Sequence, residues 1–124
     1  MIVMVLDDHP DIILLVRAMV TRVLKNEECQ FLEGRNGQEG IDLLETNDQM
    51  PEMIISNFRM PQMDGLTFFR EVRQNVNWTD IRLIMMSAHP STDLIRQASE
   101  SGAESFLRKP FNLADVEHAL LRDD

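Results

Sequence analysis

Short apolar runs alternate with longer segments of helical periodicity along the whole chain. The first run, residues 1–6, leads into an acidic pair, and apolar residues then recur at helical spacing as far as Leu24. Apolar runs of about four to eight residues are typical of buried strands, and a period of about 3.6 residues is typical of amphipathic helices. The pattern predicts five strands, each followed by a helix, at residues 1–6, 29–32, 53–55, 81–86 and 104–108.

Polar residues mark where most of the predicted helices begin. Asparagine, aspartate and serine side chains accept hydrogen bonds from the free N–H groups of a first helical turn. Asn36, followed three residues later by Glu39, predicts a capping box. The other predicted helix starts are Asp64, Ser91 and Asn112, and Gly102 is predicted to end the fourth helix.

The five alternating units predict one α/β domain, residues 1–124. Right-handed crossovers place the parallel strands between two layers of helices. We expect a flavodoxin-like (βα)5 doubly wound sheet with strand order 2-1-3-4-5, in which the weakly apolar run 29–32 lies at an edge. Ligands of such sheets bind beyond the carboxyl ends of the strands, next to the first and third strands. Functional residues are therefore expected just after the predicted strands.

The composition argues against nucleic-acid binding and against insertion into a membrane. The chain has 12 basic and 21 acidic residues, a formal net charge of −9, and its basic residues are scattered singly. No apolar run approaches the roughly 20 residues of a membrane span, and no secretory signal precedes the acidic pair. Cys29 is the only cysteine, so neither an internal disulfide nor a thiolate zinc site can form. We expect a cytoplasmic protein without nucleic-acid or membrane partners.

Five polar residues lie at the predicted carboxyl ends of the strands. Each alone has a structural explanation, since an acidic pair is usually a solvated turn and a Lys-Pro pair is usually a loop. Together at one edge they favour a ligand site, because paired carboxylates suit Mg²⁺ and a lysine with a hydroxyl suits the oxygens of a phosphoryl group. The five residues are Asp7, Asp8, Asn57, Ser87 and Lys109.

These residues and their neighbours give the chain a family resemblance over essentially its whole length. The motifs are the acidic pair Asp7-Asp8, the segment 57–65, the pair Ser87-Ala88 and the segment 109–111. In order and spacing they resemble the receiver (CheY-like) domain of two-component response regulators. The resemblance implies that a sensor histidine kinase or a phosphotransfer protein passes a phosphoryl group to the end of the third strand.

The resemblance also implies roles for individual residues. Asp8 would bind Mg²⁺ directly, Asp7 would act mainly through water, and the backbone carbonyl of Arg59 would complete the metal site with the side chain at position 57. Lys109 would pair with the phosphoryl oxygens. Ser87 would be the switch hydroxyl and Phe106 the switch aromatic, and the Lys109–Pro110 bond would be cis.

Asn57 stands where the resemblance places a phosphoryl-accepting aspartate. A neutral carboxamide is too poor a nucleophile to form an acyl phosphate, and it contributes no charge to the metal site. We therefore expect phosphoryl acceptance to be blocked and Mg²⁺ binding to be weakened. Two origins stay open, an engineered acceptor mutant and a natural variant, and the retained site residues favour a blocked but otherwise ordinary receiver. The alternative is a phosphorylation-independent pseudo-receiver that acts as a protein-interaction module.

The remaining chemistry gives weaker signals. A Mg²⁺-dependent phosphohydrolase would need a general base and a substrate pocket that the sequence does not show, so we expect no enzyme. The three histidines, His9, His89 and His118, are interpreted as isolated loop or surface residues. Charged residues on the last two βα units are usually a solvated face, but there they could also contact an output domain or a second copy of the chain: Arg96, Glu100, Glu104, Arg108, Asp115, His118 and Arg122.

Overall fold

A five-stranded parallel sheet forms the centre of the molecule. The structure is a computed structural model, and it describes residues 1–121. The sheet has the order β2-β1-β3-β4-β5, so the predicted fold class and the edge position of the second strand are confirmed. The strands are β1 (Ile2–Leu6), β2 (Gln30–Gly34), β3 (Met53–Asn57), β4 (Arg82–Ser87) and β5 (Ala103–Arg108).

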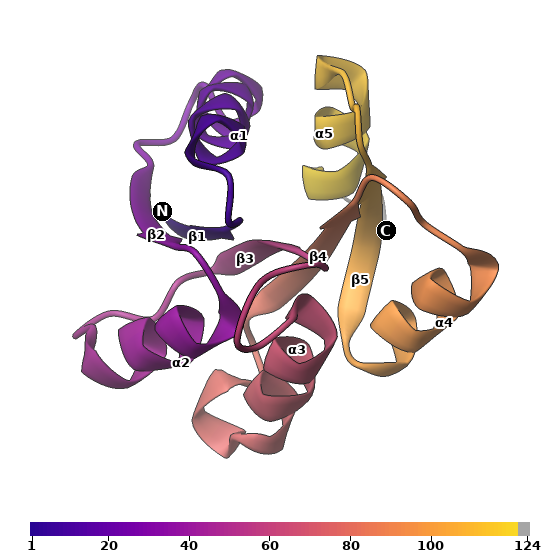
Figure 1. The fold of residues 1–124 in the computed structure, drawn as a ribbon. Helices are drawn as coiled ribbons and strands as arrows, with labels where there is room; N and C mark the ends of the chain where they lie inside the picture. Colours follow the sequence, from indigo (N-terminus) through magenta and orange to yellow (C-terminus); the bar gives the residue numbers. More distant parts are fainter. Residues whose placement is uncertain (122–124) are drawn as a thin grey trace.

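Helices cover both faces of this sheet (Figure 1). One face carries α1 (Pro10–Val23) and α5 (Leu113–Leu120). The other face carries α2 (Gly37–Thr46), α3 (Gly65–Gln74) and α4 (Thr92–Glu100). A short 3₁₀ helix, Val76–Trp78, which the pattern did not predict, leads from α3 to β4. None of the helices among residues 1–121 is long and apolar enough to span a membrane.

The strand side chains alternate between the two helix layers. Val3 and Val5 pack toward α1 and α5, whereas Met4 and Leu6 pack toward the other three helices. Because both faces of the sheet are covered, the central strands are apolar at nearly every position rather than at every second one. This explains why β1, β3 and β4 were recognisable as uninterrupted apolar runs.

The predicted helix caps are largely confirmed. Asp64 accepts a hydrogen bond from the backbone N–H of Thr67, Ser91 accepts one from Leu94, and Asn112 forms a complete capping box. Gly102 follows α4 with a φ of 103°, a conformation that favours glycine.

The capping box expected at Asn36 is only half formed. Asn36 accepts a hydrogen bond from the N–H of Glu39 at 2.9 Å, as predicted. The Glu39 carboxylate, however, accepts from the N–H of Arg35, one residue before the cap. The Glu39 carboxylate therefore does not close the box on the N–H of Asn36 itself.

Three strands extend further than their apolar runs: β2 ends at Gly34, and β3 and β4 each end on a polar residue. The parallel ladder pairs Asn57 with Met86 and Ser87 with Arg108, so both polar residues are the last residues of strands and not loop residues. Both are buried. The sheet thus positions Asn57 and Ser87 by backbone hydrogen bonds, which fixes them more firmly than a loop would.

Candidate functional site

A cavity of about 300 Å³ lies at the carboxyl ends of the central strands. It contains four of the five polar residues that the sequence placed at this edge, and the fifth, Asp7, lies directly behind them. The strand order therefore does bring together residues up to 102 positions apart in the chain. The lining residues are Asp8, His9, Asn57, Arg59, Ser87, Ala88, His89 and Lys109.

Lys109, which lines the cavity, forms an ion pair with the buried Asp7 behind it. The Asp7 carboxylate is 0% exposed, and Lys109 Nζ donates to its Oδ2 at 2.7 Å. The backbone N–H of His9 donates to the other oxygen, Oδ1, at 3.0 Å. The backbone N–H of Lys109 donates to the carbonyl of Ser87, which fixes the position of Lys109. The Lys109–Pro110 bond is cis, as the resemblance implied. A buried charge needs such partners, so Asp7 is an orienting group and does not face the solvent.

Asp8 is the carboxylate that faces the cavity. Its side chain is 33% exposed, but its Oδ1 is buried and accepts no hydrogen bond from residues 1–121. The Nδ1 atom of His9 lies 3.3 Å from this oxygen and 3.3 Å from Oδ1 of Asp7. A buried carboxylate oxygen without a donor is costly unless a cation approaches it. Asp8 is therefore suited to bind a metal ion.

Asn57 closes the third side of the cavity at the end of β3. Its Nδ2 donates to the backbone carbonyl of Arg59 at 2.7 Å. This carbonyl is the one that the family resemblance assigns to the metal. The carboxamide thus satisfies with its own N–H an oxygen that would otherwise be free to bind a cation.

Ser87 and Phe106 lie on the same face of the β4–β5 pair, because Phe106 pairs with Met85 and Ser87 follows Met85 by two residues in the same strand. Ser87 is 5% exposed, and its Oγ accepts a hydrogen bond from the N–H of His89 at 3.2 Å. Phe106 is half-buried, packs against the core beneath α3 and α4, and is not among the residues that line the cavity. Of the two, only Ser87 lines the cavity.

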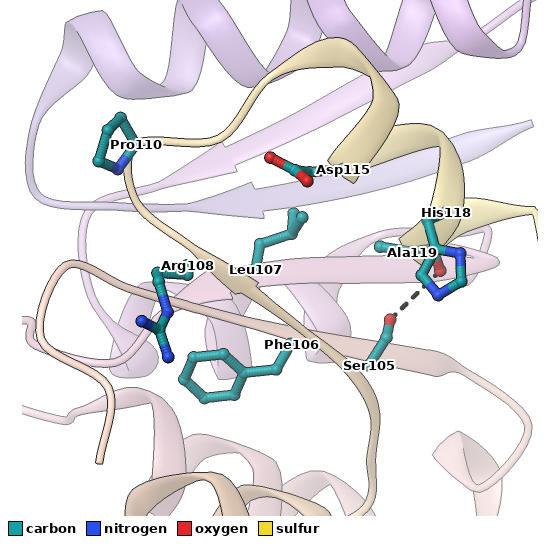
Figure 2. A pocket seen from close by; sticks show the side chains of 8 residues that line it. All are labelled: Ser105, Phe106, Leu107, Arg108, Pro110, Asp115, His118 and Ala119. Carbon is teal, nitrogen blue, oxygen red and sulfur yellow. Dashed lines mark hydrogen bonds between the residues drawn. The ribbon is translucent and has the colours of Figure 1, made fainter. Parts of the chain in front are cut away.

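A second hollow of about 330 Å³ lies between β5 and α5 (Figure 2). Phe106, Arg108, Asp115 and His118 line it, and Ser105 Oγ donates to the carbonyl of Ala119 at its floor. These residues include three members of the charged face predicted from the sequence.

The rest of that charged face is divided between other partners. Glu104 forms an ion pair with Arg82 and is only 14% exposed. Arg96 bonds within α4 to Asp93 and Glu100. Arg122 lies outside the described residues. Arg96 and Glu100 remain largely exposed, so among the described residues only Glu104 is withdrawn from the charged face.

The three histidines are loop or surface residues, as predicted, but two of them are not isolated from the site. His9 and His89 line the same cavity, and His9 contacts both carboxylates of the acidic pair. Their positions in the sequence contained the signal, because His9 directly follows the acidic pair and His89 lies two residues after Ser87, at the same edge of the sheet. His118, in contrast, is exposed on α5.

Curated relatives share this sequence pattern. A sensor histidine kinase, CheAY of Helicobacter pylori, is 35% identical over 97 residues, which are 77% of this chain but only 12% of that protein. The two-component response regulator ORR3 of rice, Oryza sativa subsp. indica, is 30% identical over 81% of this chain and 76% of its own length. The match to the histidine kinase thus concerns one small part of a much longer protein.

Solved structures share the fold. The signal receiver domain of an HD domain-containing protein from Pseudomonas fluorescens Pf-5 has a TM-score of 0.80, with 22% identity over 96% of this chain and 90% of that one. A Mn²⁺-bound form of the response regulator Rcp1 has a TM-score of 0.73, with 20% identity over 94% of this chain and 86% of that one. The response regulator receiver domain family matches residues 3–121, nearly the entire sequence. The chain is therefore a member of the receiver domains of two-component response regulators.

Proposed function

We propose that position 57 is the phosphoryl-accepting position of this receiver and that Asn57 blocks acceptance. The observation that carries the proposal is the place of Asn57, which ends β3 inside the cavity that Asp8, Ser87 and Lys109 also line. An aspartate there would sit among groups that suit phosphoryl transfer. The residue present lacks the nucleophilic oxygen that this transfer needs.

The neighbouring side chains would bind the oxygens of the incoming phosphoryl group. Lys109 supplies a positive charge that is already oriented by Asp7, and the Ser87 hydroxyl can donate a hydrogen bond. The buried Oδ1 of Asp8, which accepts no hydrogen bond, fits a divalent cation. Asp8, the Arg59 carbonyl and the side chain at position 57 would hold Mg²⁺, which neutralises charge on the phosphoryl oxygens.

Asn57 weakens this arrangement in two ways. It removes one negative charge from the site, so the electrostatic attraction for Mg²⁺ falls. Its N–H also bonds to the Arg59 carbonyl at 2.7 Å, and a cation must displace this bond before it can use that oxygen. Mg²⁺ binding is consequently weaker than in a variant that has aspartate at this position.

With aspartate at position 57, the partner is a sensor histidine kinase or a phosphotransfer protein, and the interaction takes place in the cytoplasm. The chain itself serves as a switch and catalyses no turnover of a separate substrate. Phosphoryl binding would favour a conformation with Ser87 drawn inward and Phe106 buried, which alters the surface of β5 and α5 for an output domain or a second copy. In an Asn57→Asp background, Ser87→Ala should weaken the response of this surface to a phosphoryl mimic.

Intact-mass measurement of phosphoryl uptake tests the proposal. The chain and its Asn57→Asp variant are incubated with Mg²⁺ and a small acyl-phosphate donor, with circular dichroism to verify that both are folded. We expect one phosphoryl group on the Asn57→Asp variant, none on the unmodified chain, and slower uptake when Lys109→Ala is added. Equal uptake by both chains, or uptake by neither folded chain, would contradict the proposal.

The second candidate is a phosphorylation-independent interaction module. The bond between the Asn57 amide and the Arg59 carbonyl favours it, because this bond satisfies both groups without any metal. Such a module would bind its partner equally well in the presence of a metal chelator. Loss of partner binding on chelation would exclude it.

A further inference from the structure

A hollow of about 500 Å³ lies between α2 and the end of α3, in the layer that these helices form with α4 (Figure 1). It shares no lining residue with the cavity at the carboxyl ends of the strands. The residues that define this α2–α3 hollow are Ile41, Glu45, Glu71, Val76 and Trp78. We propose that it binds a basic segment of a partner protein, with the stem of a lysine or arginine on Trp78 and the charge between Glu45 and Glu71.

The base of the α2–α3 hollow is apolar. Ile41 and Trp78 are 6% and 8% exposed, whereas Val76, two residues before Trp78, is 83% exposed. An exposed valine alone needs no explanation, but here it extends the apolar base toward solvent. Lysine and arginine bury their methylene stems on such surfaces while the charged end stays in water. The base therefore suits a long cationic side chain better than a bare ion.

The charge of the hollow is negative. Glu45 and Glu71 come from two different helices, and neither carboxylate makes an ion pair or a hydrogen bond with any residue that the structure describes. The arginines of α3 bond elsewhere, because Arg70 donates to a glutamine of α4 and Arg73 donates to backbone carbonyls. Two such carboxylates, without a cation among the lining residues, attract a positive charge.

Charge also distinguishes between the occupants that the hollow could take. A second copy of the chain carries a formal net charge of −9, and a nucleic acid is negative as well, so both are repelled. A basic segment of another protein gains from the apolar base and from the carboxylates. The inference is independent of phosphoryl acceptance, so it can be tested on the unmodified chain without Mg²⁺ or a phosphoryl donor.

Titration with a short arginine peptide tests the proposal. The probe is acetyl-Ala-Arg-Leu-Arg-Ala-amide, and in the control peptide citrulline, which has nearly the same shape without the charge, replaces both arginines. Trp78 is the only tryptophan of the chain, so its fluorescence reports occupancy of the hollow. We expect a saturable change with the arginine peptide and about tenfold weaker binding of the citrulline peptide. No saturation at millimolar arginine peptide, or equal affinity for the two peptides, would overturn the proposal.

Paired variants separate the hollow from the charge of the whole chain. Glu45→Gln with Glu71→Gln removes both carboxylates of the hollow and should weaken binding of the arginine peptide by about tenfold. Glu28→Gln with Glu117→Gln removes the same charge at exposed positions elsewhere and should leave the affinity nearly unchanged. All four side chains are exposed, so both variants should fold, which circular dichroism verifies. Equal weakening by the two pairs would show that only the net charge matters and would contradict the assignment.

Val76→Ser tests the apolar part of the hollow. It should weaken binding of the arginine peptide by about threefold, whereas Leu14→Ser, at a 64% exposed position on α1, should leave it unchanged. Unchanged affinity in Val76→Ser would contradict a role for the apolar base. The fluorescence of Trp78 should also not depend on the concentration of the chain alone. A dependence that Glu45→Gln with Glu71→Gln abolishes would assign the hollow to a second copy and overturn the basic partner.

Discussion

The two ends of the sheet bury charged side chains in different ways. At the amino ends of β4 and β5, the half-buried guanidinium of Arg73 donates to four backbone carbonyls, at distances of 2.7 to 3.3 Å. These carbonyls belong to Trp78, Thr79, Ile81 and Gly102, so one side chain joins the end of α3 to the starts of two strands. These four contacts are structural, because each supplies a hydrogen-bond donor to a backbone carbonyl.

At the carboxyl ends the buried charges are incompletely satisfied. Asp7 is paired with Lys109, but the buried Oδ1 of Asp8 accepts no hydrogen bond from residues 1–121, and the side chain of Asn57 donates to the carbonyl of Arg59, two residues further on. This edge of the sheet is poorly stabilised unless a bound ligand supplies the missing interactions. The contrast teaches that a buried polar atom without a hydrogen-bond partner distinguishes a binding site from a structural network. Burial of a charge alone does not make this distinction.

Removal of the Lys109 ammonium should cause the largest loss of unfolding free energy among these tests. Lys109→Met leaves the fully buried Asp7 carboxylate without its cation, and such losses cost about 3 kcal/mol of unfolding free energy. Urea denaturation measures the change. Lys25→Met, at an exposed position, is the control and should be nearly neutral. A loss for Lys109→Met no greater than that of the control would show that the pair does not stabilise the pocket.

The structural network at the other end should be nearly as sensitive. Burial lowers the pKa of Arg73, Glu104 partly opposes this, and the guanidinium stays protonated at neutral pH. Arg73→Met removes the donor for four carbonyls and should cost about 2 kcal/mol, measured by urea denaturation. Arg70→Met, an exposed arginine on the same helix, should cost far less. Equal losses in the two variants would remove the distinction between the ends of the sheet.

Asn57→Asp should convert the pocket into a metal-dependent element. A carboxylate at position 57 faces the Arg59 carbonyl without an N–H to donate, and it adds a negative charge near Asp8. We expect a loss of about 1 kcal/mol in metal-free buffer and its recovery when Mg²⁺ is added. Asn77→Asp adds the same charge at an exposed position and should show no Mg²⁺ dependence. If the unfolding free energy of Asn57→Asp did not change on addition of Mg²⁺, this would argue against a cation site.

The smallest effect is expected at Asp93, which is exposed on α4. Hydrogen bonds from Arg96 and Gln97 hold the pKa of its carboxyl below the ordinary value. The stabilising contribution is therefore present above the ordinary carboxyl pKa and is lost as the pH falls through the lowered value. Asp93→Asn should lower the melting temperature slightly near neutral pH, less so in high salt, and not at all in strong acid. A difference that grows in acid would contradict this sign.

Much of the fold was predictable because its signals are local. Apolar runs and helical spacing fixed the order of the elements, and residues such as Asp64 and Ser91 marked where helices begin. The edge rule for parallel sheets then placed Asp8, Asn57 and Lys109 together. No pattern in the sequence could show that Arg73 reaches four carbonyls, because one of them, at Gly102, lies 29 residues away and only the tertiary fold brings it beside residues 78–81.

The site itself was predictable in its residues but not in its bonds. The sequence identified Asn57 and Arg59 as neighbours in a loop, yet it could not show that the amide of one would satisfy the carbonyl of the other. It also gave no weight to His9, because the three histidines are far apart in the sequence and show no paired ligand spacing. The contact of His9 with both carboxylates depends on the conformation of the connection between β1 and α1, which is set by tertiary packing.

The most direct test of the central claim is to locate any phosphoryl group by chemical trapping. Borohydride converts an aspartyl phosphate into homoserine, which tandem mass spectrometry can assign to one position. After treatment with an acyl-phosphate donor and Mg²⁺, homoserine should occur at position 57 of Asn57→Asp and nowhere in the unmodified chain. Homoserine at Asp7, Asp8 or Asp64 of the unmodified chain would show that Asn57 does not block acceptance and would contradict the account.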